Sequence, residues 1–327
     1  MEYGRLIRDA WQMTWRHPFL WLLGLFAGGT AGASFNGGGR GGGGAPPGAD
    51  GRMMPEMPFP GMHVGPESIG LWASEHLWLI LGVVALLVVV GLALLVLSLI
   101  AQGGLTGATV DFASGRSSSL GRAWRTGLHL FWRYAGLWLL LVATVALIAA
   151  LVAAFVATII WLTTVVQQTA WVIAPAVLVG LLLVMAGIVA GVVASIVVPF
   201  AQRAIAAQNL GPLAALRDGW TVFRGRPGAS LLIWLINLAL NVGAGLAVTV
   251  VMLVTLLALG VPAAALWSLF QFSTPTVTYL VVAGIVALGA LLTLVSITNT
   301  FFWSYWTLAY LRLRPGPPTN TPTETPA

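Results

Sequence analysis

Arginine is the residue type whose spacing in this sequence points most directly to chemistry. It supplies every basic side chain, because the sequence contains no lysine. The planar guanidinium group matches the geometry of phosphate, which suits it to lipid headgroups. Most arginines gather in short basic segments directly before apolar stretches. The arginines that we predict to contact anionic lipid are Arg5, Arg8, Arg16, Arg122, Arg125, Arg133, Arg217, Arg224 and Arg226.

A methionine-rich segment is the second candidate for chemistry. Met53, Met54, Met57 and Met62 lie close to His63. Thioether and imidazole groups are ligands that suit Cu(I). Methionine is also a common adaptable contact residue, so the same segment could lie on the membrane or on a partner. The second interpretation is the simpler one, and we predict no metal and no other cofactor.

The residues that most catalytic sites need are absent or isolated. There is no cysteine, which excludes thiolate nucleophiles and cysteine zinc sites. The four histidines, His17, His63, His76 and His129, stand at or outside the ends of the apolar stretches. No zinc motif and no Ser/His pair can be assembled from their neighbours. We therefore expect a protein that is not an enzyme.

The overall composition indicates an integral membrane protein. Of the 327 residues, 58% are hydrophobic and only 7% are charged, and the mean hydropathy is +0.93. Soluble domains carry about 25% charged residues. The formal net charge of +6 does not indicate nucleic-acid binding, because the arginines are not gathered on a soluble face.

Stretches without charge predict six membrane helices and their orientation. A spanning helix needs roughly 20 apolar residues. The predicted spans lie near residues 77–101, 135–162, 171–198, 230–259 and 277–296, with a shorter one at 19–33. All arginines except Arg40 and Arg52 then fall on one side, with Arg203 among the loop residues. By the positive-inside rule both termini are cytoplasmic, and we expect a bacterial inner membrane.

The basic segments belong to an internal repeat. The sequence GRLIR at 4–8 reappears as GRAWR at 121–125. The sequence RDAW at 8–11 reappears as RDGW at 217–220, and a proline follows each at the same distance, Pro18 and Pro227. We predict three parallel units, near 1–101, 117–200 and 210–312, each an interfacial amphipathic helix plus a helical hairpin.

One membrane domain, residues 1–314, is expected, with two segments outside the bundle. The external loop at about 36–68 is rich in Gly, Pro and Met, and the tail at 315–327 is expected to be disordered and cytoplasmic. The N-terminus also resembles a signal peptide, with Ala31-Gly32-Ala33 in the place of a cleavage site. We expect the first span to be retained, because it belongs to the repeat.

Polar and small residues inside the spans favour helix packing. Asn237 and Asn241 share a helix face, and Asn299 lies near the end of the last span. Such amides either line a substrate path or form hydrogen bonds between helices, worth about 0.6 kcal/mol each. Small residues spaced by four predict close helix contacts, within or between chains. They are Gly24, Gly28 and Gly32, Gly103 and Gly107, and Gly187 and Gly191.

The segment Ala-Leu-Arg-Asp-Gly-Trp at 215–220 carries a family resemblance. Together with the basic helix before each hairpin, it resembles uncharacterised bacterial six-helix proteins of the glycerophosphoryl diester phosphodiesterase membrane-domain type. In that group the catalytic activity belongs to a separate soluble domain, and only a short Pro/Thr tail follows Arg314 here. The resemblance therefore implies a membrane module without the enzyme, and it supplies no catalytic residue.

The function that these observations favour is a non-catalytic scaffold or accessory subunit. Its expected partners are anionic membrane lipids and a protein, either a different one or a second copy of the chain. No nucleic acid is expected. The alternative is a passive transporter or channel-like protein for an uncharged or lipidic substrate, with Asn237 and Asn241 lining the path.

Overall fold

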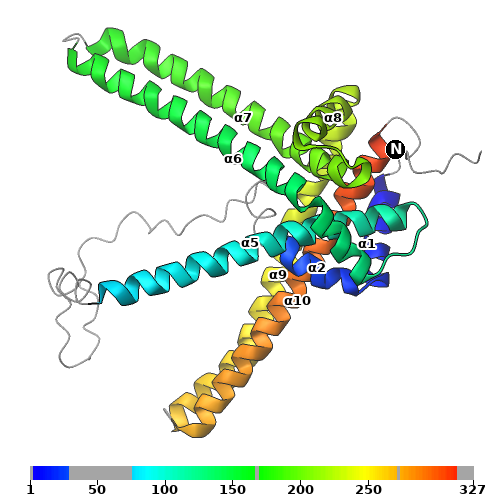
Figure 1. The fold of residues 1–327 in the computed structure, drawn as a ribbon. Coiled ribbons are helices and arrows are strands. Elements are labelled where there is room, and N and C mark those ends of the chain that lie inside the picture. Colours follow the sequence, from blue (N-terminus) through cyan, green and yellow to red (C-terminus); the bar gives the residue numbers. More distant parts are fainter. Residues whose placement is uncertain (1–2, 29–75, 166–168, 271–272, 315–327) are drawn as a thin grey trace, which may run out of the picture. The chain divides into compact units, whose positions relative to one another are not determined.

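A computed structural model describes residues 3–28, 76–165, 169–270 and 273–314 of the chain (Figure 1). Every regular element in these residues is a helix, which confirms the all-α class. The methionine-rich segment, the external loop and the C-terminal tail lie outside the described residues. The helices are α1 (Tyr3–Arg16), α2 (Phe19–Ala27), α5 (Leu77–Ala113), α6 (Leu120–Val165), α7 (Thr169–Gln208), α8 (Pro212–Gly225), α9 (Pro227–Phe270) and α10 (Thr274–Leu313).

The chain divides into two compact units. One unit is Gly38–Val96, and its described part is the first half of α5. Side chains in that half are largely exposed; Leu87, for example, is 63% exposed. The other unit comprises Met1–Gly37 and Leu97–Ala327 and contains the remaining helices.

Five helices are long and apolar enough to cross a membrane: α5, α6, α7, α9 and α10. The sixth predicted span is not shown, because α2 has nine residues and the sequence that follows Gly28 is outside the described part. The helices that contain the predicted spans extend beyond them. Helix α6 has 46 residues, so it is about 69 Å long, whereas a bilayer core is about 30 Å thick. Each long helix therefore extends well beyond one membrane thickness.

The second repeat unit departs from the predicted arrangement. Its basic segment is not a separate interfacial helix but the first part of α6, which continues unbroken to Val165. In the other units the basic helix ends just before a proline, Pro18 after α1 and Pro227 after α8. Alanine, Ala135, stands at the corresponding place in α6. Because proline interrupts helix hydrogen bonding and alanine favours the helix, only the second copy continues.

A packed core forms where the ends of the long helices meet α1, α2 and α8. In α5 every residue from Ser98 to Thr109 is buried, and in α10 every residue from Thr300 to Tyr310. Such runs are enclosed on all sides, unlike an ordinary amphipathic helix with one buried face. Aromatic rings fill much of the interior. The fully buried rings are Tyr134, Tyr305, Tyr310 and Phe200.

Hydrogen bonds attach the short helix α2 to α10. The hydroxyl of Thr300 donates to the carbonyl of Leu20 over 3.1 Å, and the amide of Asn299 donates to the carbonyl of Gly24 over 3.2 Å. The hydroxyl of Ser296 donates to the carbonyl of Trp21. These bonds lie between helices, so the packing interpretation of Asn299 is confirmed.

Candidate functional site

The nine arginines predicted to contact lipid are nearly all at the surface of the described structure. All except Arg133 are exposed, and Arg133 is half-buried. The guanidinium of Arg133 donates to both the carbonyl and the side-chain oxygen of Asn209, in the turn before α8. Arg133 therefore has a structural contact that the repeat pattern did not predict.

The first basic segment, α1, is amphipathic as predicted. Leu6, Ala10 and Thr14 are buried at intervals of four, whereas Arg5, Arg8 and Arg16 are exposed. An ion pair between Asp9 and Arg312 connects α1 to the end of α10. After α1, the ring of His17 stacks on Phe112 with centroids 3.9 Å apart. Burial, and secondarily Arg16, lower the pKa of His17 below its usual value of 6.5.

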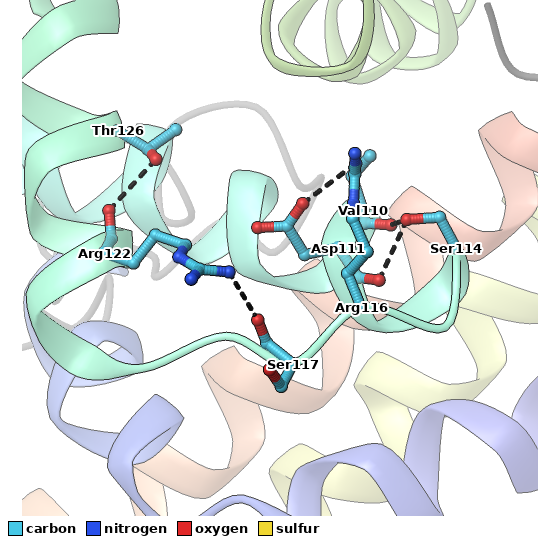
Figure 2. A network of polar contacts seen from close by, with 7 residues as sticks. All are labelled: Val110, Asp111, Ser114, Arg116, Ser117, Arg122 and Thr126. Atoms are coloured by element: carbon cyan, nitrogen blue, oxygen red, sulfur yellow. Dashed lines mark hydrogen bonds and ion pairs between the residues drawn. The ribbon is translucent and has the colours of Figure 1, made fainter. Parts of the chain in front are cut away.

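The second basic segment begins after a turn that links α5 to α6 (Figure 2). Arg116 forms a 3.0 Å ion pair with Asp111, and Arg122 donates to the carbonyl of Ser117 over 2.8 Å. Gly115 has a φ of 75°, which glycine adopts without steric cost. Ser119 caps the start of α6, because its hydroxyl accepts from the backbone N–H of Arg122 over 3.4 Å. Arg122 thus takes part in the turn that precedes its helix.

The third basic segment, α8, packs across α7. Pro212 occupies the first turn, and Ala215, Gly219 and Val222 form the buried face. A Cβ atom at Gly219 would lie 2.8 Å from the carbonyl oxygen of Val197. The absence of a side chain at Gly219 is therefore what allows the backbones of α8 and α7 to approach so closely.

Arg203, which is predicted to lie in a cytoplasmic loop, is a buried arginine. The structure places it on α7, only 3% exposed. Its Nη1 donates to the Gln202 side chain over 2.8 Å, and its Cζ lies 4.2 Å from the centre of the Trp303 ring. A cation over an aromatic face is stabilised without a carboxylate. The signal that could have identified this position is its place within an apolar helix of 40 residues.

Tyr134 is buried in the same core. Its hydroxyl donates to the carbonyl of Gln202 over 2.8 Å and lies 3.4 Å from the Thr106 hydroxyl. Residues from α5, α6 and α7 therefore meet at one side chain. Polar side chains and aromatic rings are therefore both buried in this core.

Tryptophan positions near predicted span ends fall into two groups. Trp78 and Trp161 are 84% and 62% exposed, which suits rings at a membrane interface. Trp303 and Trp306 are 7% and 2% exposed. These last two rings therefore belong to the core and not to a membrane interface.

The two asparagines of the transport alternative lie on α9. Asn237 is 3% exposed and its side-chain oxygen has no hydrogen-bond partner. Asn241 donates to the backbone carbonyl of Asn237 over 2.8 Å, a bond within the same helix. The predicted common face is present, but the contact between the two residues is local.

The predicted small-residue contacts also separate into two groups. Gly24, Gly28, Gly103 and Gly107 are in close contact with neighbouring helices, since a Cβ atom at any of them would lie within 3.2 Å of another segment. Gly187 and Gly191 have no such neighbour within 4 Å. Close packing within the chain is confirmed for the first group only. The alternative for the second, a contact between chains, stays a prediction, and Gly32 lies outside the described residues.

The next feature is the possible metal site. Among the described residues no group of three or more His, Cys, Asp or Glu side chains could hold a metal ion. The copper candidates Met53, Met54, Met57, Met62 and His63 all lie outside the described residues.

Comparison with known proteins yields one match. Residues 12–314 match a family of unknown function, DUF7544. No curated protein and no solved structure matches the chain.

Proposed function

This chain belongs to the DUF7544 family, whose function is unknown, and we propose that it is a non-catalytic integral membrane protein that acts as a scaffold or accessory subunit. Its basic surface contacts anionic lipids, and its membrane-facing helices contact a protein partner or a second copy of the chain. Arg5, Arg8, Arg16, Arg122, Arg125, Arg133, Arg217, Arg224 and Arg226 are the proposed lipid contacts.

The observation that carries this proposal is the separation of roles within each basic helix. In α1 and α8 one face is buried in the core by small or apolar side chains, and the arginines occupy the remaining surface. The helices are thus held by packing of one face, and their arginines lie on the exposed surface that faces away from the core. An arginine near an anionic leaflet contributes about 1 kcal/mol of attraction.

The large aromatic rings in the core support a scaffold over a transporter. The core is occupied by large rings such as Tyr134, Tyr305 and Trp306. Asn237 and Asn241, on which the transport alternative depends, form a bond within one helix. That bond is explained by packing alone.

The finer features of the proposal are its topology and location. We place the basic side in the cytoplasm of a bacterial cell, with six spans, three parallel repeats and both termini inside. The arginine distribution supports this orientation. The resemblance to phosphodiesterase-associated membrane domains supports a module that works beside other proteins.

The test neutralises one exposed arginine from each basic segment. We expect the triple variant Arg8→Gln, Arg125→Gln, Arg226→Gln to lose most of its copurifying anionic phospholipid while it keeps its thermal midpoint. Three lost attractions of about 1 kcal/mol each correspond to at least a tenfold weaker binding. Lipids and proteins that remain after purification in a mild detergent are quantified by mass spectrometry.

The matched control replaces the same three residues by lysine. Lysine keeps the charge and therefore the orientation, so most anionic lipid should be retained. A wild-type protein that purifies as a monomer with no preference for anionic lipid would contradict the proposal. Transport of an uncharged solute that is lost in Asn237→Leu with Asn241→Leu would establish the alternative.

A further inference from the structure

The third basic helix, α8, has three distinct surfaces. Its buried face, centred on Gly219, packs on α7. At 100° per residue, Leu216 and Trp220 lie on one side of that face. Arg217 and Arg224 come next around the helix, beyond Trp220. The centre of the buried face, the apolar edge and the arginines of α8 therefore lie next to one another within one half of the helix circumference.

The apolar edge of α8 borders a groove between α6 and α7. The groove has a volume of about 770 Å³, within the range of about 300–1,000 Å³ found for small-molecule sites. Leu216 and Trp220 line it from α8, Leu140, Leu141 and Thr144 from α6. The residues of α7 that line it are Met185, Ala186, Val189, Ala190, Val193, Ala194, Val197 and Val198.

This groove suits a hydrocarbon chain. Its only side-chain hydroxyl, on Thr144, already donates to the carbonyl of Leu140 over 2.8 Å. The α7 residues that line it belong to the candidate span Ala174–Gln208. An occupant would therefore enter from the apolar part of the membrane. Three alanines, Ala186, Ala190 and Ala194, repeat at intervals of four along its wall and keep it open.

The charged edge of α8 lies directly beside the groove. Arg217 and Arg224 are both exposed and stand seven residues apart, or about 10 Å along the helix. Trp220 lies between them. The acidic residue of the helix, Asp218, does not neutralise them. Its carboxylate accepts from the hydroxyl of Tyr310 over 2.6 Å and from the amide of Gln208 over 3.1 Å, on the core side.

We propose that this place binds one anionic phospholipid. Arg217 and Arg224 hold the phosphate, Trp220 lies at the boundary, and one acyl chain occupies the groove between α6 and α7. The inference rests on the proposed function and gives it a particular site: the general basic surface attracts anionic lipid, and the groove beside α8 selects and retains one molecule. An amphipathic occupant is indicated because the apolar and the cationic surfaces adjoin.

The experiment is native mass spectrometry of the full chain titrated with phosphatidylglycerol in a mild detergent. We expect the wild type to retain one phosphatidylglycerol at least tenfold more tightly than the rest. Arg217→Gln with Arg224→Gln should weaken that first molecule at least fivefold. Ala190→Phe with Ala194→Phe, which fills the groove and leaves the charges, should do the same. A thermal midpoint measured for each variant shows that it is folded.

The matched control removes equal charge elsewhere. Arg8→Gln with Arg125→Gln should lower the number of weakly bound lipids and leave the first one in place. Equal losses from both arginine pairs would overturn the site and leave the proposed function standing. A wild type without any preference for anionic lipid would overturn both.

Two further arms identify the source of the ligand and keep the test decisive. Inorganic phosphate should not displace the first lipid; displacement would show a free-anion site and refute the acyl-chain part of the proposal. If the phenylalanine variant fails to fold, Trp220→Ala takes its place, since it removes groove wall at an exposed position. A first lipid held as tightly in Trp220→Ala as in the wild type would count against the groove.

Discussion

The packed core and the hairpin ends of this protein are both built from apolar helices, yet their side chains have opposite environments. The hairpin ends are residues 145–164 and 174–192 of one hairpin and 245–269 and 274–295 of the other. Leu147, Leu182 and Ile285 there are 61%, 61% and 66% exposed. In α10, by contrast, every residue from Thr300 to Tyr310 is buried.

Hydropathy alone therefore does not determine where such helices pack. The most apolar 18-residue stretches of α6 and α9 contain no buried residue. In lipid there is no hydrophobic drive between helices, so association depends on close packing and on hydrogen bonds. The core has both, through glycines that touch neighbouring helices and hydroxyls that reach neighbouring backbones.

The largest expected contrast is between two tryptophans. Trp303→Ala should destabilise the protein by about 3–5 kcal/mol, because it opens a cavity in the core and removes the aromatic face above Arg203. Trp161→Ala, at a 62% exposed position of a hairpin end, should stay within about 0.5 kcal/mol. Thermal unfolding midpoints in one detergent measure both. Similar shifts for the two variants would mean that the core is not the more tightly packed region.

Alanine substitutions at two glycines should change the stability of the protein in opposite directions. A Cβ atom at Gly127 would lie 2.1 Å from the carbonyl oxygen of Ile100, so the backbones of α6 and α5 must separate. We expect Gly127→Ala to cost about 2 kcal/mol. Gly187 has no neighbour within 4 Å, and Gly187→Ala should gain up to about 1 kcal/mol from helix propensity.

The variant Gly187→Ala also tests the oligomeric state. If Gly187 packs against a second chain, Gly187→Ala should weaken that association in size-exclusion chromatography with light scattering. A monomeric wild type with an unchanged profile would exclude this glycine from an interface between copies.

The smallest expected contrast is between two tyrosine hydroxyls that bond similar partners. Tyr134 donates to the carbonyl of Gln202 over 2.8 Å in the core, and Tyr279 donates to the carbonyl of Leu259 over 3.0 Å in a hairpin end. Tyr134→Phe should cost about 1–1.5 kcal/mol. Tyr279→Phe should cost about 0.6 kcal/mol, the average for such bonds in membrane proteins. Chemical denaturation in mixed micelles would resolve the order, and a reversed order would contradict it.

Local sequence signals predicted individual elements well. Periodicity predicted an amphipathic helix at α1, which the structure has. Ser119 and Pro212 are residue types that commonly begin helices, and they stand at the starts of α6 and α8. Apolar length identified five of the spans, because length and composition are properties of a segment alone. The same signals misjudged the second basic segment, where the repeat suggested a separate helix and the alanine at 135 allows a continuous one.

The candidate site was only half visible in the sequence. The arginines of α8 could be found from their spacing. The groove beside them could not, since it is made by three helices whose residues are far apart in the chain and whose composition matches the rest of the membrane surface. The structural roles of Arg133 and Arg203 were missed for the same reason, because each depends on a partner from another segment, the turn before α8 for Arg133 and α10 for Arg203.

The sequence by itself determined that this chain is an all-helical membrane protein with its charges gathered in short basic segments. Composition and charge spacing act residue by residue, so no partner is needed to interpret them. Only the tertiary structure decided which apolar surfaces become core and which stay exposed. That choice depends on whether two backbones can approach at Gly127 or Gly219 and whether a buried polar group such as Arg203 finds its counterpart. Both conditions depend on pairs of packed helices, whereas a hydropathy profile describes one segment at a time.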